Sequence, residues 1–187
     1  MVSRFLRILV TALVIAFHCG AAAAERPPEW AQPLVVAGVP NLYQIAPGVF
    51  RSAQPTAIGM RHLEAMGIRT VISFRHFHDD RELMKGTHLH LIRVPINTWD
   101  ISDEEVVATL RELKRAADGP FLIHCQHGAD RTGLMSAMYR IVVQGWDKQR
   151  AVEELTRGGY GYHAIWQNIL HYIDGVDVDK IRRQVGN

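Results

Sequence analysis

The sequence contains few cysteines, no repeated or low-complexity segment and no excess of charge of one sign. Among its 187 residues there are two cysteines, and 21 basic residues stand against 19 acidic ones, a formal net charge of +2. Such a small charge gives no reason to expect binding to nucleic acid. Hydrophobic residues make up 48% of the chain and charged residues 21%, which excludes a disordered or collagen-like chain and suits a single globular domain.

No apolar run in the sequence is long enough to cross a bilayer comfortably. The longest, residues 8–17, follows Arg4 and Arg7 and leads into an alanine cluster that ends at Ala24. A basic start, a short apolar stretch and small residues at the end are typical of a secretory signal peptide. We predict that residues 1–24 are such a signal peptide. The mature protein is then periplasmic or secreted, with no stable membrane insertion after cleavage.

Removal of residues 1–24 changes both the charge and the thiol content. It takes away two arginines and no acid, which leaves 19 residues of each sign, and it takes away Cys19. Cys125 is then the only thiol, so the mature chain cannot form an intrachain disulfide. A lone reactive thiol in an oxidising compartment is exposed to oxidation.

The most informative segment is His-Cys-Gln-His-Gly-Ala-Asp-Arg-Thr-Gly at residues 124–133. The apolar residues 120–124 predict a buried strand, and residues 131–143 predict an apolar helix. In a tight loop between them, the N–H groups of residues 126–131 have no helical partners and can point at an anion. The helix dipole adds to this attraction. The segment therefore predicts an anion-binding loop.

The side chains of this loop indicate that the anion is a phosphate that reacts. Arg131 supplies a planar fork for two phosphate oxygens. Gly128 suits an unusual backbone angle, and Gly133 allows the helix to pack tightly on the strand. The positive field of the loop favours a thiolate at Cys125, and hence a nucleophile. The alternative is that Cys125 is only a small buried hydrophobic residue at the end of a strand.

The Cys-x5-Arg-Thr-Gly pattern resembles the cysteine-dependent protein tyrosine and dual-specificity phosphatases. Residues 49–55 are similar to the YRSxQP segment of the compact dual-specificity branch, and residues 138–146 resemble its bacterial secreted members. The resemblance extends from about residue 41 to about residue 174. Arg51, in the first of these segments, is either a second anion contact or the partner of a carboxylate.

Strand and helix signals alternate along the rest of the chain, which predicts an α/β domain. We expect a central, mostly parallel sheet flanked by helices, with the phosphate loop between a central strand and a helix, as in a compact dual-specificity phosphatase. The expected strands are 41–46, 49–53, 70–74, 89–94 and 120–124, and the expected further helices are 56–66, 103–117, 147–157 and 163–172. Residues 25–40, rich in proline, predict a leader or linker, and residues 41–187 the phosphatase domain.

The resemblance implies a general acid on the loop between Pro95 and Asp103. Two aspartates compete for this role. Asp103 has a structural explanation, because it lies in the first turn of a helix capped by Ser102. Asp100 has no capping role. We therefore predict Asp100 as the acid, with Asp103 as the alternative.

The resemblance also implies the roles of the other residues of the loop. Cys125 attacks phosphorus and becomes a phosphocysteine, Arg131 holds phosphate oxygens, and no cofactor or metal is needed. His124 fixes the loop through a hydrogen bond to nearby backbone, and the Thr132 hydroxyl hydrogen-bonds the sulfur. The remaining phosphate contacts come from Gln126, His127, Gly128, Ala129 and Asp130. As metal ligands, His124, Cys125 and His127 would not converge on a tetrahedral centre without a fourth partner.

The composition of the loop also bears on the substrate. It has no lysine between Cys125 and Arg131, whereas relatives that hydrolyse inositol phosphates often carry lysines there, and Asp130 would repel a polyanion. We predict a phosphorylated protein as substrate, phosphotyrosine first, with phosphoserine and phosphothreonine open. The alternatives are a phosphatase of inositol phosphates or other small phosphomonoesters, and a non-catalytic phosphate-binding module. The sequence gives no prediction of the oligomeric state.

Overall fold

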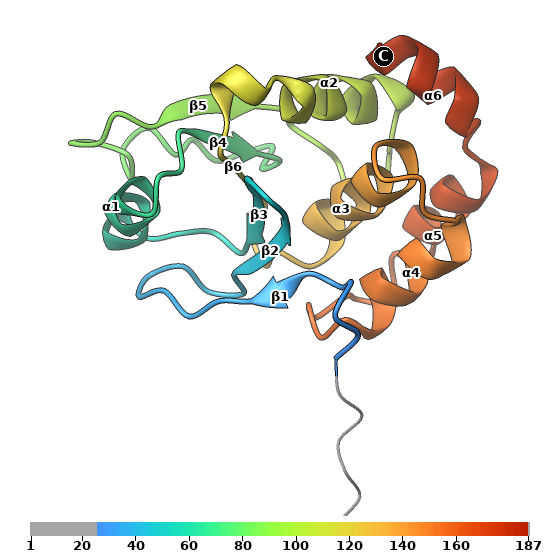
Figure 1. The fold of residues 1–187 in the computed structure, drawn as a ribbon, viewed down its shortest axis with the longest axis horizontal. Coiled ribbons are helices and arrows are strands. Elements are labelled where there is room, and N and C mark those ends of the chain that lie inside the picture. The colour runs from blue at the N-terminus through green and yellow to red at the C-terminus, as the bar shows by residue number, and fades with distance from the viewer. Residues whose placement is uncertain (1–25, 187) are drawn as a thin grey trace, which may run out of the picture.

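Six strands form one sheet in the order β1-β2-β3-β6-β4-β5 in the computed structural model, which describes residues 26–186 (Figure 1). Neighbours in β1, β2 and β3 are antiparallel, and β3, β6, β4 and β5 are parallel. The strands are β1 (Gln32–Pro33), β2 (Tyr43–Ala46), β3 (Val49–Ser52), β4 (Thr70–Ser73), β5 (His90–Arg93) and β6 (Phe121–His124). The α/β class with a mostly parallel sheet is confirmed. The predicted signal peptide, with Cys19, lies outside the described residues.

Helices follow the strands as expected until the last part of the chain. They are α1 (Ala57–Ala65), α2 (Asp103–Lys114), α3 (Asp130–Val142), α4 (Lys148–Arg157), α5 (Gln167–Gly175) and α6 (Val178–Val185), with a short 3-10 helix at Ala116–Asp118. The helix expected from residue 163 begins only at Gln167, after an irregular segment in which Gly159 and Gly161 adopt positive φ. The sequence analysis does not predict α6, although Asp177 caps it.

Side chains of the central strands alternate between two hydrophobic cores, one on each face of the sheet. In β6, Phe121 and Ile123 enter the larger core and Leu122 the smaller one. The larger core lies between the sheet and α2 to α6, and the smaller one lies under α1, on the opposite face (Figure 1). Each large aliphatic side chain buried in this way contributes about 1.5–3 kcal/mol. The carboxyl end of β6 is thus fixed from both faces.

Residues 26–40 are not the leader or linker that their prolines predict. Ala31 and Val39 are buried, and β1 pairs with β2 at the edge of the sheet, a position that tolerates Pro33. Arg26 donates hydrogen bonds to Ala31 O at 2.7 Å, Gly158 O at 2.7 Å and Tyr160 Oη at 2.6 Å. The prolines interrupt regular structure here, but the segment packs on the domain and is part of it.

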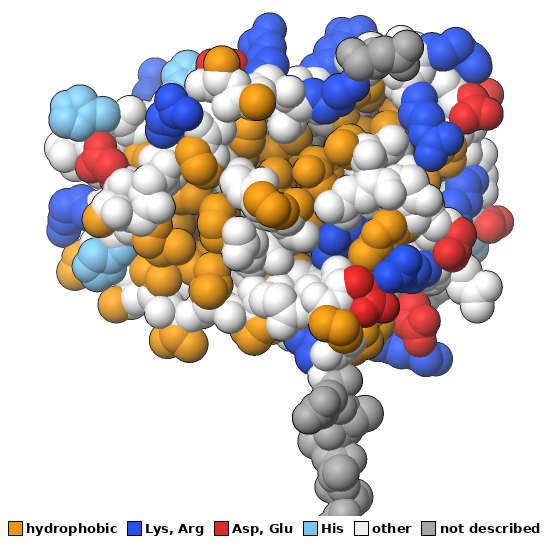
Figure 2. All heavy atoms as spheres, in the orientation of Figure 1, with side chains coloured by type: hydrophobic (Ala, Val, Ile, Leu, Met, Phe, Trp, Pro, Cys, Tyr) orange, Lys and Arg blue, Asp and Glu red, His pale blue; other side chains and the backbone are white. Residues whose placement is uncertain are grey.

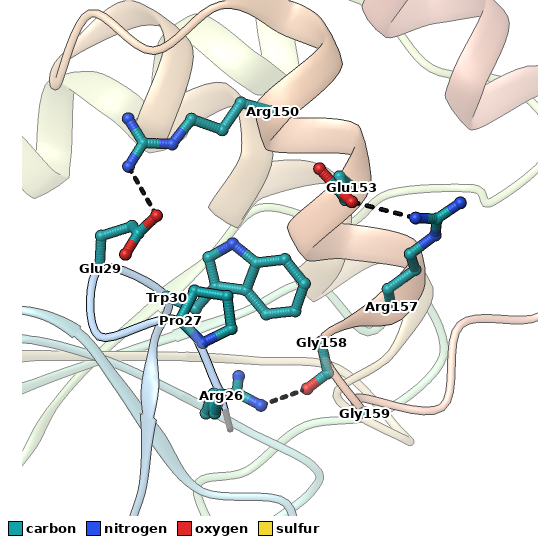
Figure 3. Close-up of a pocket in the computed structure, with 9 residues that line it drawn as sticks. All are labelled: Arg26, Pro27, Glu29, Trp30, Arg150, Glu153, Arg157, Gly158 and Gly159. Carbon is teal, nitrogen blue, oxygen red and sulfur yellow. Dashed lines mark hydrogen bonds and ion pairs between the residues drawn. The ribbon is translucent and has the colours of Figure 1, made fainter. Parts of the chain in front are cut away.

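A cavity of about 650 Å³ remains where residues 26–30 lie beside α4 (Figure 3). The charged side chains around it pair with one another. Glu29 lies 3.1 Å from Arg150, and Glu153 lies 3.0 Å from Arg157. None of the candidate site residues lines this cavity. The cavity lies where the N-terminal segment packs against α4.

A buried ion pair joins α3, α4 and the N-terminal segment. Arg140 contacts both carboxylate oxygens of Glu154, at 2.8 and 2.9 Å, and the Ala31 amide donates to Glu154 Oε1 at 2.6 Å. The Tyr160 hydroxyl donates to the same oxygen at 2.9 Å. Burial alone would raise the pKa of Glu154, but the hydrogen bonds from Arg140 and Ala31 outweigh it and lower the pKa. The carboxylate is therefore ionised in the folded protein.

The surface carries charges of both signs. Basic side chains gather along the edge over α2 and α6 (Figure 2). Two of them are already engaged, because Arg111 and Lys114 donate to the carbonyls of Gln184 and Gly186 at the end of α6. Within residues 26–186, no helix combines the length and apolarity that a membrane span requires.

Replacing Glu154 by alanine is expected to lower the free energy of unfolding by about 3–5 kcal/mol, because Arg140 would be left buried without its partner. Since folding lowers the Glu154 pKa, this stabilisation is present above the pKa of an unfolded glutamate, about 4.3, and is lost as the pH falls through the folded value. Denaturant unfolding at pH 7 and at pH 3.5 measures both effects. The matched control is Glu153→Ala, at an exposed surface pair. Equal losses for the two variants at pH 7 would contradict the assignment.

Candidate active site

Cys125 lies at the carboxyl end of β6, in the middle of the parallel strands. The residue before it, His124, is in register with Ser52 of β3 on one side and Ser73 of β4 on the other. Cys125 is 2% exposed and is the free cysteine of the described residues. Open α/β sheets bind ligands at this edge.

Three successive carbonyl groups of the phosphate loop, residues 125–131, accept hydrogen bonds from outside the loop. The pairs are Gln54 N to Gln126 O at 3.1 Å, Asn41 Nδ2 to His127 O at 2.9 Å, and Arg51 Nη2 to Gly128 O at 2.5 Å. In a trans peptide the C=O and the following N–H point in opposite directions. Since these carbonyls face outward, the N–H groups of residues 127–129 face the inside of the loop, as anion binding requires.

The start of α3 extends this row of amides. Its N-cap is Ala129, which makes no side-chain cap hydrogen bond, whereas α1, α2, α4 and α6 each begin with a capping side chain. The first amides of an uncapped helix and the helix dipole attract an anion. The N-terminus of α3 therefore faces the loop that carries Cys125.

Gly128 is required by its surroundings, and Gly133 leaves room for a neighbouring side chain. Gly128 has φ +69°, and a Cβ there would lie 2.6 Å from the backbone of Ser52 and Ala53. A Cβ on Gly133 would lie 2.3 Å from Cδ1 of Leu155. Gly133 therefore allows α3 to approach α4, rather than the strand that the sequence analysis names.

Arg51 is neither an anion contact nor the partner of a carboxylate, the two roles that the sequence leaves open. Its side chain is buried, and its guanidinium carbon lies 3.7 Å from the centre of the Tyr160 ring. Burial lowers the Arg51 pKa, and the nearby Tyr160 and Glu154 partly offset this. Together with its hydrogen bond to Gly128 O, this contact makes Arg51 a support of the phosphate loop.

Two further supports, Asn41 and Gln54, are absent from the sequence prediction. Asn41 Nδ2 also donates to Tyr160 O at 3.0 Å, so it joins the loop to the segment after α4. Asn41 adopts a positive φ of 56°, a conformation that asparagine tolerates better than most residues. Gln54 belongs to the YRSxQP-like segment 49–55, but its contact with Gln126 O is made by its backbone and does not depend on its residue type.

A cavity of about 270 Å³ opens beside the loop and contains Arg131. Arg131 Nη1 donates to Phe74 O at 3.3 Å, which directs its side chain across the end of β4. Two lining residues are exposed aromatics, Phe77 at 90% and Trp99 at 66%. The lining consists of Arg75, His76, Phe77, Ile96, Asn97, Thr98, Trp99, Gln126 and Arg131.

The structure separates the two candidate acids. Asp103 accepts hydrogen bonds from Tyr172 Oη at 2.9 Å and Lys180 Nζ at 2.7 Å, and the Lys180 bond lowers its pKa. Asp100 is exposed, and within residues 26–186 its carboxylate makes no hydrogen bond. It does not line the cavity itself, but the three residues before it, 97–99, do. Asp103 is thus held by α5 and α6, whereas Asp100 is free at the edge of the cavity.

His124 and Thr132 are the two residues that the resemblance assigns to the support of Cys125. His124 Nδ1 is 3.2 Å from Cys125 O, the contact to nearby backbone that the resemblance implies. Its Nε2 faces Asp80, a residue that the sequence analysis does not single out. The Thr132 hydroxyl is buried and has no hydrogen-bond partner in the described part of the chain, so it is available to the sulfur.

Asp130 is engaged within the protein, so it gives less reason to exclude polyanionic substrates than the sequence suggests. Asp130 is 8% exposed, and its two oxygens bind the His163 amide at 2.9 Å and His163 Nδ1 at 2.8 Å. The carboxylate is therefore occupied by the segment after α4.

The two histidines of the motif have other neighbours and do not form a metal site with Cys125. The His127 ring lies beside the His163 ring, with 5.6 Å between their centres, and His124 faces Asp80. Among residues 26–186 there is no group of three or more side chains suited to hold a metal ion.

Comparison with known proteins identifies the family. Residues 44–169 match the family model described as DSP-PTPase phosphatase fused to NAD+ kinase, PTP-NADK. The chain belongs to the dual-specificity phosphatases. It is 41% identical over 190 residues to the dual specificity protein phosphatase TpbA of Pseudomonas aeruginosa strain UCBPP-PA14, covering 98% of this chain and 86% of that protein. The family expected from the Cys-x5-Arg-Thr-Gly pattern is thus confirmed.

Solved structures of TpbA from P. aeruginosa share the fold. One crystal structure has a TM-score of 0.78 and 41% identity, and covers 87% of this chain and 100% of its own. A second, of a cysteine-to-serine variant in complex with phosphotyrosine, has a TM-score of 0.78 and 40% identity, and covers 87% of this chain and 99% of its own. The arrangement of sheet and helices described above is therefore that of this dual-specificity phosphatase.

Changing Gly128 to alanine is expected to weaken the binding of inorganic phosphate or vanadate by more than about tenfold, because the new Cβ forces the loop away from Ser52 and Ala53. Calorimetric titration measures the affinity. Gly145→Ala is the matched control, since Gly145 has φ +73° and open space around its Cβ position. Gly145→Ala is expected to lose about 1 kcal/mol of stability through backbone strain and to keep its affinity for phosphate or vanadate. Equal affinities for the two variants would contradict the conclusion that the loop binds the anion only while Gly128 lies close to Ser52 and Ala53.

Proposed function

We propose that the protein is a cysteine-dependent protein phosphatase that hydrolyses phosphotyrosine, and phosphoserine or phosphothreonine to a lesser extent, through a phosphocysteine intermediate. The observation that carries this proposal is the position of Cys125. It is buried at the end of β6, next to a row of inward-facing amides and in the same loop as Arg131. A purely structural cysteine would not require a loop in which the carbonyls of residues 126–128 are held outward.

In the first step, Cys125 Sγ attacks phosphorus in line with the ester oxygen. The S–P bond forms as the P–O bond to the substrate breaks. The amides of residues 127–129 and the Arg131 guanidinium hold the three other phosphate oxygens, where the negative charge is greatest. Asp100 gives its proton to the departing oxygen. The products of this step are the dephosphorylated side chain and phosphocysteine.

In the second step, water attacks the phosphocysteine. Its O–P bond forms as the S–P bond breaks, and the Asp100 carboxylate accepts the proton that the water loses. The Thr132 hydroxyl donates to the sulfur as it leaves as thiolate. Phosphate then departs from the loop. Apart from this water, each role in the two steps is assigned to a side chain or an amide of this chain.

The aromatic rim of the cavity supports phosphotyrosine as the main substrate. Phe77 and Trp99 are exposed large aromatic side chains that line the same cavity as Arg131. They come from two different segments, after β4 and after β5, so an aryl ring that projects from the phosphate would lie between apolar surfaces. A phosphoserine has no ring to fill this space. TpbA, with 40% identity, has been crystallised with phosphotyrosine.

We also propose that the protein is exported, with residues 1–24 as a cleaved signal peptide and the periplasm or the exterior as its location. The basic, apolar and alanine-rich sequence of residues 1–24 supports this. The substrate would then be a phosphorylated protein of the same compartment.

Cys125→Ser is expected to abolish hydrolysis of an aryl phosphate, because the hydroxyl is a far weaker nucleophile than a thiolate. Asp100→Ala is expected to lower kcat by about 10²–10⁴-fold for esters with a poor leaving group, and much less for p-nitrophenyl phosphate, whose leaving group needs no proton. Steady-state kinetics on both ester classes measures this difference.

The control for the acid is Asp103→Ala, which removes the contacts with Tyr172 and Lys180 and is expected to lower thermal stability without dependence on the leaving group. If Asp103→Ala shows the leaving-group dependence and Asp100→Ala does not, the acid is Asp103. Full activity of Cys125→Ser would exclude the mechanism. Faster hydrolysis of inositol phosphates than of phosphotyrosine peptides would contradict the substrate.

Trp99→Ala and Phe77→Ala are each expected to lower kcat/KM for a phosphotyrosine peptide by about two- to twelvefold, since an aromatic contact contributes about 0.5–1.5 kcal/mol. Neither change is expected to affect kcat/KM for the matching phosphoserine peptide, so the ratio of the two values is the measurement. Ile58→Ala is the control, because Ile58 is also an exposed apolar residue, 53%, but lies on α1. An unchanged ratio in both aromatic variants would exclude the aromatic rim as a specificity determinant.

A further inference from the structure

Asn168 is a side chain of α5 that contacts the loop carrying the proposed acid. Its Nδ2 donates a hydrogen bond to Thr98 O at 2.7 Å, although the two residues lie 70 positions apart in the chain. Thr98 is 8% exposed and lines the cavity that contains Arg131. The chemistry described above gives Asn168 no role. The contact joins α5 to the segment just before Asp100.

Thr98 lies in a tight turn formed by residues 97–100. The Asp100 amide donates to Asn97 O at 3.1 Å, which closes the turn. The peptide after Thr98 is the central one of such a turn, and the closing hydrogen bond does not include it. Since a peptide is a rigid plane, the bond from Asn168 to Thr98 O fixes the direction in which the chain approaches Asp100.

Other contacts fix the two ends of this loop. Before the turn, the Ile96 amide donates to Phe74 O at 3.2 Å. After the turn, Asp103 accepts from Tyr172 Oη at 2.9 Å. Asn168 and Tyr172 are four residues apart on α5, so they lie on one face of this helix. That face of α5 supports both the turn and the segment that follows it.

Asn168 brings no advantage to α5 itself. Asparagine favours the capping position of a helix, but the N-cap of α5 is Trp166, which makes no side-chain cap hydrogen bond. Asn168 lies two positions further along, and its amide reaches Thr98 O instead of the backbone of its own helix. Glutamine, the residue type at the neighbouring Gln167, is the better helix former. The contact with the loop, rather than the stability of α5, accounts for an asparagine here.

We propose that Asn168 is a positioning residue that holds the Asp100 carboxyl at the edge of the cavity, where it can reach the departing ester oxygen. Among the described residues, Asn168 is the one that hydrogen-bonds to the turn from outside it. The Asp100 side chain is exposed, so the backbone of the turn is what places the carboxyl. General acid catalysis depends on this position, because the proton is transferred over hydrogen-bond distance. The inference rests on the proposed function of Asp100 as the acid.

The first experiment measures how strongly hydrolysis depends on the leaving group. Asn168→Leu keeps the approximate size of the side chain and removes its N–H donor. It is expected to lower kcat for phenyl phosphate by about tenfold, a part of the 10²–10⁴-fold that a general acid contributes, and kcat for p-nitrophenyl phosphate by less than about twofold. KM is expected to stay the same for both esters, because the phosphate loop is unchanged.

Gln167→Leu is the matched control. Gln167 is the adjacent residue of α5, and its Nε2 donates to Ala164 O at 2.6 Å, within its own segment. Its replacement is expected to leave both kcat values unchanged. Circular dichroism and thermal unfolding establish that both variants are folded. An equal loss on both esters in Asn168→Leu would indicate a merely structural role and overturn the proposal.

A double-mutant cycle tests whether Asn168 acts through Asp100. In the Asp100→Ala background, Asn168→Leu is expected to cause no further loss on phenyl phosphate, because the acid that it positions is gone. A further loss of the same size would overturn the inference while the acid role of Asp100 stands. If Asp100→Ala alone shows no dependence on the leaving group, the acid assignment fails, and the inference falls with it.

The second experiment follows the turn itself and needs no substrate. Hydrogen exchange of the Asp100 amide, observed by NMR, reports how often its bond to Asn97 O is open. Asn168→Leu is expected to raise the exchange rate by about two- to tenfold, the effect of one lost hydrogen bond, and Gln167→Leu to leave it unchanged. The same exchange rate in Asn168→Leu as in the unchanged protein would overturn the proposal.

Discussion

The phosphate loop can hold an anion only because the oxygens of its peptide groups are held on the outside. Four consecutive carbonyls, of residues 125–128, contact groups that lie outside the loop. The contacting residues are His124, Gln54, Asn41 and Arg51. Since each peptide is a rigid plane, these contacts also fix the direction of the N–H groups before any substrate arrives. Preorganised donors of this kind need no rearrangement as charge develops on phosphorus.

Behind the phosphate loop, a buried positive side chain lies nearest to the loop and a buried negative one lies further away. Arg51 lies directly under Gly128, and Tyr160 separates it from the carboxylate of Glu154. Burial and the Glu154 charge raise the Tyr160 pKa, so its hydroxyl stays protonated and donates. Glu154 in turn pairs with Arg140. The positive group lies next to the phosphate loop and the negative group one side chain further away, an order that favours an anion in the loop.

The sequence predicts the parts of the site that depend on neighbours in the chain. The strand, loop and helix around Cys125, the need for Gly128 and the choice of Arg131 all follow from one segment. The supports do not, because Asn41 and Gln54 reach the loop only through tertiary packing, and neither residue type shows which carbonyl it will contact. Prolines in residues 26–40 indicate turns but not whether the segment docks. The partner of Asp130 is equally hidden from the sequence, because His163 lies 33 residues further along.

The hydrogen bond between Arg26 and Gly158 spans 132 residues, and its neighbour at Tyr160 spans 134. Tyr160 is the side chain on which Arg51 stacks, so the first described residue and the segment after α4 meet beneath the phosphate loop. A chain that starts after Arg26 or ends before Gly158 lacks one partner of these contacts. The phosphate loop is short and local, but the contacts beneath it form only when Arg26 and the segment after α4 have met, and closing so long a stretch of chain is the entropic cost of that support.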